Sequence, residues 1–348
     1  CAPLLATTGA LLAMAEQTAP EPVTFLAAGS CGPCRYALFG PAWRRALAQA
    51  GASHVQVVTI EQVWDSMLQG LGEPLWLRAL DALLAGDALA LARRRLRPHV
   101  LDRGELDARC EAAADAIVQR IRAGEPPLAA LYAERSCVAQ LPLRPAQALG
   151  RVALIGDPWS LHVDGEAQNH VTTLLTDAGV EVESPPLALW LAYRLWASAQ
   201  GERRVPQPAA SAAELHEARE RWLRVRLRLA CDALGMRAEL PSVQELVDLA
   251  APYQPASIAG GYGPIEVGLA ARVRAQRRAH VVISVKAFGC NPSRSIAEAI
   301  AQSESGGADG GPAFDWDIFL HLGDISGTQA PPTDADGPPV VEQLTSGK

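Results

Sequence analysis

Residues 23–36 read Val-Thr-Phe-Leu-Ala-Ala-Gly-Ser-Cys-Gly-Pro-Cys-Arg-Tyr, an apolar run followed by a glycine-rich turn. The run at 23–28 is partly β-branched and stops at Gly29, which is typical of a buried strand that leads into a loop. Apolar residues then recur at helical spacing over 38–50, and a second apolar strand is predicted over 54–60. Strand, helix and strand in this order indicate a parallel βαβ unit.

Outward from this unit, helical stretches alternate with short apolar runs. Residues 73–132 are rich in Ala, Leu and Arg and are punctuated by proline and glycine, which predicts a group of helices. Further strands are predicted at 152–155, 180–183, 280–285 and 317–322, with helices at 166–177, 210–234, 242–250, 265–278 and 296–302. Residues 156–165 are predicted to be a loop. Because strands alternate with helices, parallel sheets covered on both faces are expected.

The predicted fold class is therefore α/β, with two Rossmann- or flavodoxin-like parallel-sheet subdomains and a helical insertion. The first α/β subdomain is expected at 1–65, the helical insertion or cap at 66–148, and the second α/β subdomain at 149–329. The remainder, 330–348, is rich in proline, glycine and acidic residues, so we expect a flexible tail.

Composition narrows the class of protein. The chain has 348 residues, about half of them apolar, which is enough for two compact domains. The net charge of -7 argues against nucleic acid as a partner. The sequence has neither an apolar run of about 20 residues nor a signal-peptide pattern, so a cytoplasmic protein without a membrane segment is expected. Lysine occurs only as Lys286 and Lys348 among many arginines, which indicates a GC-rich bacterial genome.

Seven cysteines in such a chain favour reduced thiols, metal ligands or core residues over disulfides. Cys31 and Cys34 form a CxxC motif whose thiolates can be stabilised by a helix that begins near Arg35. Alone, this motif fits a thioredoxin-like redox pair, half of a zinc site or half of an iron–sulfur site. Cys110, Cys137 and Cys231 lie in helical, apolar contexts that are typical of core cysteines.

Cys290 lies in a second loop of the same kind, Phe288-Gly-Cys-Asn-Pro-Ser293, between a predicted strand and a predicted helix. The C-terminal ends of parallel strands gather at one edge of a sheet, so Cys31, Cys34 and Cys290 are expected to converge. Cys1 is a fourth candidate, followed by a helix-like stretch at 4–15.

These cysteine segments carry a family resemblance. Residues 1–9 (Cys-Ala-Pro-Leu-Leu-Ala-Thr-Thr-Gly), 32–36 (Gly-Pro-Cys-Arg-Tyr) and 286–293 (Lys-Ala-Phe-Gly-Cys-Asn-Pro-Ser) resemble, in the same order, three blocks of the activase-related proteins that are similar to 2-hydroxyacyl-CoA dehydratase subunits. The resemblance is weaker in two further blocks. One is Gly156-Asp157 leading to Asn169 and Gly179, and the other is Gly323-Asp324.

The resemblance implies a 4Fe-4S-type cluster in a cleft between α/β subdomains, with Cys1, Cys31, Cys34 and Cys290 as the metal ligands. It also implies electron transfer in acyl-CoA dehydratase-type chemistry, an acyl-CoA or similar small-molecule substrate, and an ATP-hydrolysing activase domain or subunit as partner. A fused ATPase domain would lie upstream of Cys1. A second copy of the chain, in a homodimer, is another candidate partner. Three cysteines would leave one iron open, whereas four would close the cluster and favour electron transfer.

Several single residues have two interpretations each. Lys286 is either a cation near the cluster or a CoA phosphate, or a strand-end residue that reaches solvent. Arg35 either balances the charge of the cluster or forms a surface ion pair. Glu266 is either a capping acid or a catalytic acid. Asp157 and Asn169 either bind substrate or hydrogen-bond the surroundings of the cluster; otherwise Asp157 shapes a turn and Asn169 hydrogen-bonds to the backbone. For the whole chain, the alternative is a docking or regulatory module that holds a structural metal without catalysis of its own.

Overall fold

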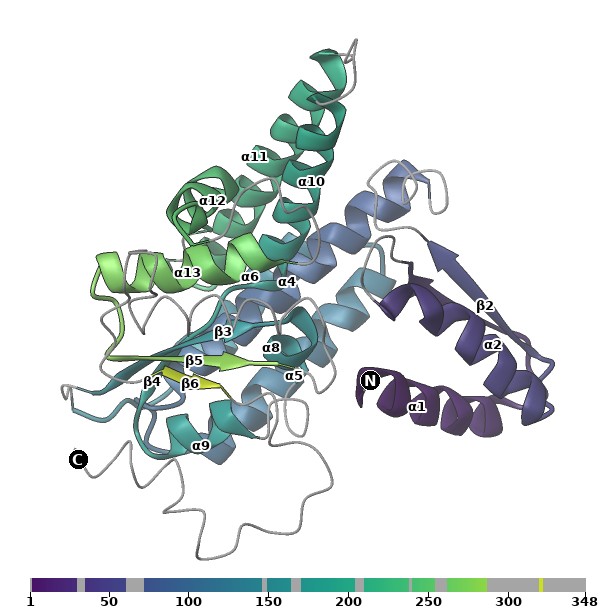
Figure 1. Cartoon of the computed structure of the whole chain (residues 1–348). Coiled ribbons are helices and arrows are strands. Elements are labelled where there is room, and N and C mark those ends of the chain that lie inside the picture. Colours follow the sequence, from purple (N-terminus) through teal and green to yellow (C-terminus); the bar gives the residue numbers. More distant parts are fainter. Residues whose placement is uncertain are drawn as a thin grey trace, which may run out of the picture.

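The computed structural model describes residues 2–29, 35–60, 72–145, 149–163, 170–203, 210–237, 240–253, 262–286 and 319–321. Within these ranges the chain is mostly helical and contains two small parallel sheets (Figure 1). The α/β class predicted from the sequence is confirmed at this level. Within the same ranges, every helix is too short or too polar to span a lipid bilayer.

The N-terminal unit is built around the strand that opens the sequence argument. It comprises α1 (Ala2–Thr18), β1 (Val23–Ala28), the 3-10 turn η1 (Arg35–Leu38), α2 (Phe39–Gln49) and β2 (Val55–Ile60). The strands β1 and β2 pair in parallel, with Val23 opposite Val55, so the predicted strands and the helix between them are confirmed. Trp43 of α2 meets Phe25 of β1 edge to face at 5.4 Å, which joins the helix to the sheet.

A helical layer follows at the range where helices were predicted. It contains α4 (Glu73–Leu96), α5 (Arg103–Arg122), α6 (Pro127–Ala133) and α7 (Arg135–Ala139). The start of α5 is capped by Asp102, whose side chain accepts a hydrogen bond from the Glu105 backbone N–H at 3.0 Å.

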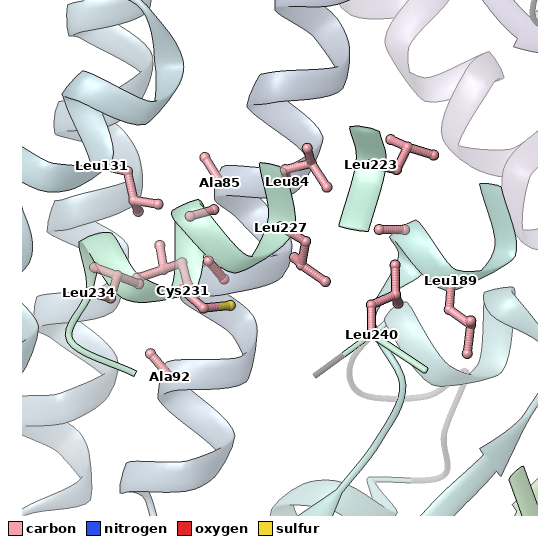
Figure 2. Close-up of a cluster of buried hydrophobic side chains, with 14 of the residues drawn as sticks. Leu84, Ala85, Ala92, Leu131, Leu189, Leu223, Leu227, Cys231, Leu234 and Leu240 are labelled. Carbon is pink, nitrogen blue, oxygen red and sulfur yellow. The ribbon is translucent and has the colours of Figure 1, made fainter. Parts of the chain in front are cut away.

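This layer packs against α10 (Leu187–Arg203) and α11 (Ala210–Ala233), and α12 (Val243–Ala250) packs against α10. Figure 2 shows Leu84 of α4, Leu131 of α6 and Leu227 of α11 in one apolar cluster. The core that they share therefore draws on residues from both sides of the predicted boundary between 148 and 149. The predicted domain limits themselves stay a prediction.

The second sheet contains β3 (Arg151–Gly156), β4 (Glu181–Glu183), β5 (Val281–Val285) and β6 (Phe319–His321) in the order β4-β3-β5-β6, all parallel. Alternate residues of β3 face opposite sides, as expected for a strand. Ala153 and Ile155 pack under α13 (Gly263–Ala275).

Val152 and Leu154 of β3 pack on the other face of the sheet. They contact Leu161 of α8 (Pro158–His162) and Leu175 of α9 (Val171–Asp177). Both faces are thus covered, which agrees with the strand and helix alternation in the sequence.

Two details differ from the sequence predictions. The helix α10 was not predicted, and the stretch 156–165, predicted as a loop, contains the short helix α8. The helix predicted at 296–302 and the whole predicted tail at 330–348 lie outside the described residues.

Candidate functional site

The candidate site lies at the C-terminal edge of the second sheet, where β3 and β5 end side by side. Gly156, the last residue of β3, is paired with Val285, the last residue of β5. A Cβ atom on Gly156 would lie 1.8 Å from the Val285 carbonyl oxygen, so glycine is required where these two backbones approach. In Figure 1, β5 runs toward the side of the molecule on which the N-terminal unit lies.

Lys286 is the first residue after β5, and its ammonium group is buried. Its Nζ atom lies 3.2 Å from Oε1 of Glu266, and the two side chains are 3% and 1% exposed. The interpretation of Lys286 as a strand-end residue that reaches solvent is therefore wrong. Because burial removes the hydration of both charges, loss of either partner would leave an uncompensated buried charge and destabilise the fold.

Glu266 belongs to the first turn of α13, but it does not act as a surface cap there. Its Oε1 also accepts a hydrogen bond from Ser284 Oγ at 2.6 Å, so β5 supplies a second donor to the same oxygen. Its other oxygen, Oε2, has no hydrogen-bond partner within the described part of the chain. Burial raises the pKa of Glu266, the charge of Lys286 and the hydrogen bond from Ser284 oppose this rise, and the negative charge of Asp157 adds to it.

Asp157 follows β3 directly and shapes the turn into α8. Its Oδ1 accepts a hydrogen bond from the Ser160 backbone N–H at 3.0 Å, and its Oδ2 accepts one from Ser160 Oγ at 2.7 Å. Its own N–H donates to the Val285 carbonyl at 3.2 Å, which ties the turn to β5. The turn-shaping interpretation of Asp157 is confirmed, and Asp157 is also an N-cap.

A small cavity of about 30 Å³ adjoins Glu266, and His162, Tyr262 and Trp190 contribute to its lining. Burial, with a smaller contribution from the nearby charge of Arg94, lowers the pKa of His162 to about 4. His162 is therefore a neutral imidazole near pH 7. The edge of the sheet thus combines a buried ion pair, a buried carboxylate oxygen without a partner and a neutral ring.

Chemically, this arrangement fixes the backbone at the start of the Cys290 loop. Lys286 is anchored by Glu266 on a helix and by its own position at the end of a central strand, so the chain leaves the sheet at a defined point. Cys290 follows four residues later and lies outside the described residues.

The other residues predicted for the site are placed only in part. Cys1, Cys31, Cys34 and Asn169 lie outside the described residues, and of Arg35 the structure gives the backbone, at the start of η1. The described flanks show that the CxxC loop begins after the C-terminal end of β1 and that the Cys290 loop begins after that of β5. In the described ranges, no three His, Cys, Asp or Glu side chains come together as a metal site.

The cysteines predicted for the core can be compared with the structure. Cys110 and Cys231 are buried inside the helical core, as predicted. Burial raises the pKa of Cys231 to about 11, so this thiol stays protonated and unreactive. Cys137 lies in α7.

Sequence reasoning missed the polar partners at this edge. Ser284 and Ser160 were not singled out, because a serine in an apolar strand or after a turn carries no distinctive pattern. Arg94 also lacks a distinctive sequence signal within its arginine-rich helix, but it is buried and donates to Ser184 Oγ at 2.5 Å and to the Leu161 carbonyl at 3.0 Å. The useful signal was Lys286, a single lysine at the end of an apolar strand.

Comparisons with protein-family models, with curated protein sequences and with solved structures gave no match.

Proposed function

We propose that this chain is an iron–sulfur protein related to the 2-hydroxyacyl-CoA dehydratases. Cys1, Cys31, Cys34 and Cys290 bind a 4Fe-4S-type cluster at a cleft between two Rossmann- or flavodoxin-like subdomains. One subdomain contains β1 and β2, and the other contains β3 to β6. In this proposal the protein passes low-potential electrons in acyl-CoA dehydratase- or reductase-type chemistry in the cytoplasm, with an ATP-hydrolysing activase domain or subunit as its partner.

The observation that supports the proposal is the place in the fold at which each of the two cysteine-containing segments begins. Each loop follows the C-terminal end of a parallel strand, β1 for Cys31 and Cys34 and β5 for Cys290. β1 and β5 belong to different sheets, and in a parallel α/β sheet ligands bind at the C-terminal edge of the strands. Four thiols also suit iron, because thiolates are the usual ligands of iron–sulfur clusters.

When bound, such a cluster supplies one-electron transfer. The protein's own part is to hold the cysteine loops and to balance charge. The buried pair of Lys286 and Glu266 fixes the start of the Cys290 loop. Arg35 directly follows Cys34 in the sequence, and in this proposal its positive charge stabilises the thiolates of the CxxC motif.

The test is anaerobic purification followed by iron and sulfide analysis. We expect a brown protein with about four irons and four sulfides per chain and with broad thiolate-to-iron absorption, together with an EPR signal after reduction. C31S, C34S and C290S should each lower the iron content. C1S separates a closed four-cysteine cluster, which it would disrupt, from a three-cysteine site, which it would leave intact.

The matched control is C110A, because Cys110 is a buried thiol within the helical core. It should keep the full iron content. A colourless protein that binds zinc through the same cysteines would contradict the proposal and would favour the structural-metal docking module. Iron binding that persists in C31S, C34S and C290S would contradict it as well.

A further inference from the structure

A second candidate site is a cavity of about 510 Å³ beside β4, an edge strand of the described sheet. It is bounded by β4 and β3, by α4, by α13, which lies over the sheet in Figure 1, and by chain segments near 236 and 241. Neither Lys286 nor Glu266 lines it. Six arginines line it: Arg94, Arg95, Arg151, Arg237, Arg272 and Arg278.

The charges around this cavity do not cancel. Its two acidic side chains already have basic partners, since Glu183 pairs with Arg278 at 2.8 Å and Glu181 contacts His99 at 3.0 Å. In the described part of the chain, Arg95, Arg151 and Arg237 form no ion pair. A chain with a net charge of -7 therefore concentrates unpaired positive charge in one concave place.

The arginines come from elements with a rigid connection to the sheet. Arg94 is 7% exposed and is fixed by hydrogen bonds to Ser184 Oγ and to the Leu161 carbonyl, so α4 and β4 are tied together at the cavity wall. Arg95 donates to the Arg237 carbonyl at 2.5 Å, which ties the end of α4 to the chain at Arg237, another lining residue. Arg151 is the first residue of β3. The backbone positions of Arg94, Arg95 and Arg151 are therefore fixed, and Arg151 and Arg237 contribute exposed side chains to the cavity wall.

Apolar side chains form part of the wall as well. Leu91, Leu154, Val182, Met236 and Leu269 line the cavity between the arginines. Its volume lies within the range of about 300–1,000 Å³ that is typical of small-molecule sites. Guanidinium groups bind phosphate oxygens in pairs, and several of them together suit an anion with more than one charge.

We infer that this cavity binds the diphosphate group of a small molecule, with Arg95, Arg151 and Arg237 as its ligands. The inference does not rest on the proposed iron–sulfur function, because it uses none of the cysteines. The diphosphate can be free pyrophosphate or part of a nucleoside diphosphate, in which case the apolar walls receive the organic part.

The experiment is isothermal titration of the full chain with sodium pyrophosphate and, separately, with ADP. Saturable binding is expected for pyrophosphate, and the affinity should fall as the salt concentration rises. Each of R151Q and R237Q should weaken binding about tenfold, since a hydrogen bond to a charged group is typically worth this factor. Tighter binding of ADP assigns a nucleotide-like ligand, and equal binding assigns free diphosphate.

The matched control is R122Q, an exposed arginine at the end of α5 that does not line the cavity. Arg151 and Arg237 are exposed as well, so these substitutions should leave the thermal unfolding midpoint unchanged. As a measurement on the unaltered chain, pyrophosphate should protect Arg151 and Arg237 from modification by phenylglyoxal, read by mass spectrometry. The inference is overturned if no saturable binding occurs, or if R122Q weakens binding as much as R151Q and R237Q do.

Discussion

The ammonium of Lys286 and the carboxylate of Glu266 form a buried ion pair at 3.2 Å that joins the end of β5 to the first turn of α13. K286M should lower the free energy of unfolding by about 3–5 kcal/mol near pH 7, because it leaves a buried carboxylate without its counter-charge. The loss should shrink at acid pH, where Glu266 takes up a proton. Urea unfolding of the wild type and K286M at both pH values measures this.

The double variant K286M/E266Q separates this ion pair from simple loss of packing. It carries no unpaired buried charge, and its glutamine can still accept the hydrogen bond from Ser284, so it should recover most of the lost stability. For comparison, R228M breaks the exposed pair with Asp232 and should cost less than about 1 kcal/mol. A loss below about 1 kcal/mol for K286M would contradict the account of this pair.

Asp87 caps a helix that begins far along the chain. Its two oxygens accept hydrogen bonds from the backbone N–H groups of Leu187 and Ala188 at 2.9 and 2.8 Å, and burial raises its pKa to about 6. The folded state therefore holds the proton more tightly than the unfolded state. Stability from this group is present below pH 3.8 and is lost, by about 3 kcal/mol, as the pH rises to about 6.

D87N tests this dependence, because asparagine does not titrate. Its unfolding free energy, measured in urea between about pH 4 and pH 7, should lack the decline that Asp87 contributes to the wild type. The stability difference between the wild type and D87N should thus become smaller as the pH rises. A constant difference would show that Asp87 titrates normally.

His162 has the opposite dependence in an overlapping pH range. Its pKa is lowered from 6.5 to about 4, so the unfolded chain takes up a proton before the folded chain does. Stability from this group is present above pH 6.5 and is lost, by about 3 kcal/mol, as the pH falls toward 4. H162Q should remove this acid-side loss in urea unfolding. An NMR titration of the native protein in which the His162 ring protons change chemical shift with a midpoint near pH 6.5 would contradict the lowered pKa.

Substitution of two helix glycines by alanine should change the stability of the protein in opposite directions. A Cβ atom at Gly268 of α13 would lie 2.1 Å from the Leu246 carbonyl oxygen of α12, so G268A must push the two helices apart. We expect a loss of about 1–3 kcal/mol. Gly86 of α4 has no atom within 4 Å of its Cβ position, so G86A should stabilise by about 0.5–1 kcal/mol through helix propensity. Thermal unfolding of both variants provides the comparison.

The sequence predicted most elements of this fold because their signals are local. The strands β1 and β3 are apolar runs followed by glycine or a turn, and their structure agrees with that pattern. The helix α10 was missed for a physical reason. From Leu187 to Trp196 nearly every position is apolar, so no period of 3.6 can be seen, and its N-terminus is capped by Asp87 from another helix.

The candidate site shows the same division between local and long-range information. The position of Lys286 after an apolar strand marked it as unusual in the sequence. Its partner Glu266 has an ordinary place in the first turn of a helix, and only the packing of α13 on the sheet turns its side chain toward Lys286. By contrast, Asp157 followed by Pro158 is a local helix-start signal that would have predicted α8.

The core shared by α4, α6, α10, α11 and α12 has a consequence for the synthesis of this protein. Ribosomes add about 5–20 residues per second, so α4 and α6 emerge several seconds before α11 and α12. During that interval, Leu84 and Leu131 lack the neighbours that cover them in the finished molecule. The nascent chain therefore exposes part of this apolar surface to solvent until its later helices have been synthesised.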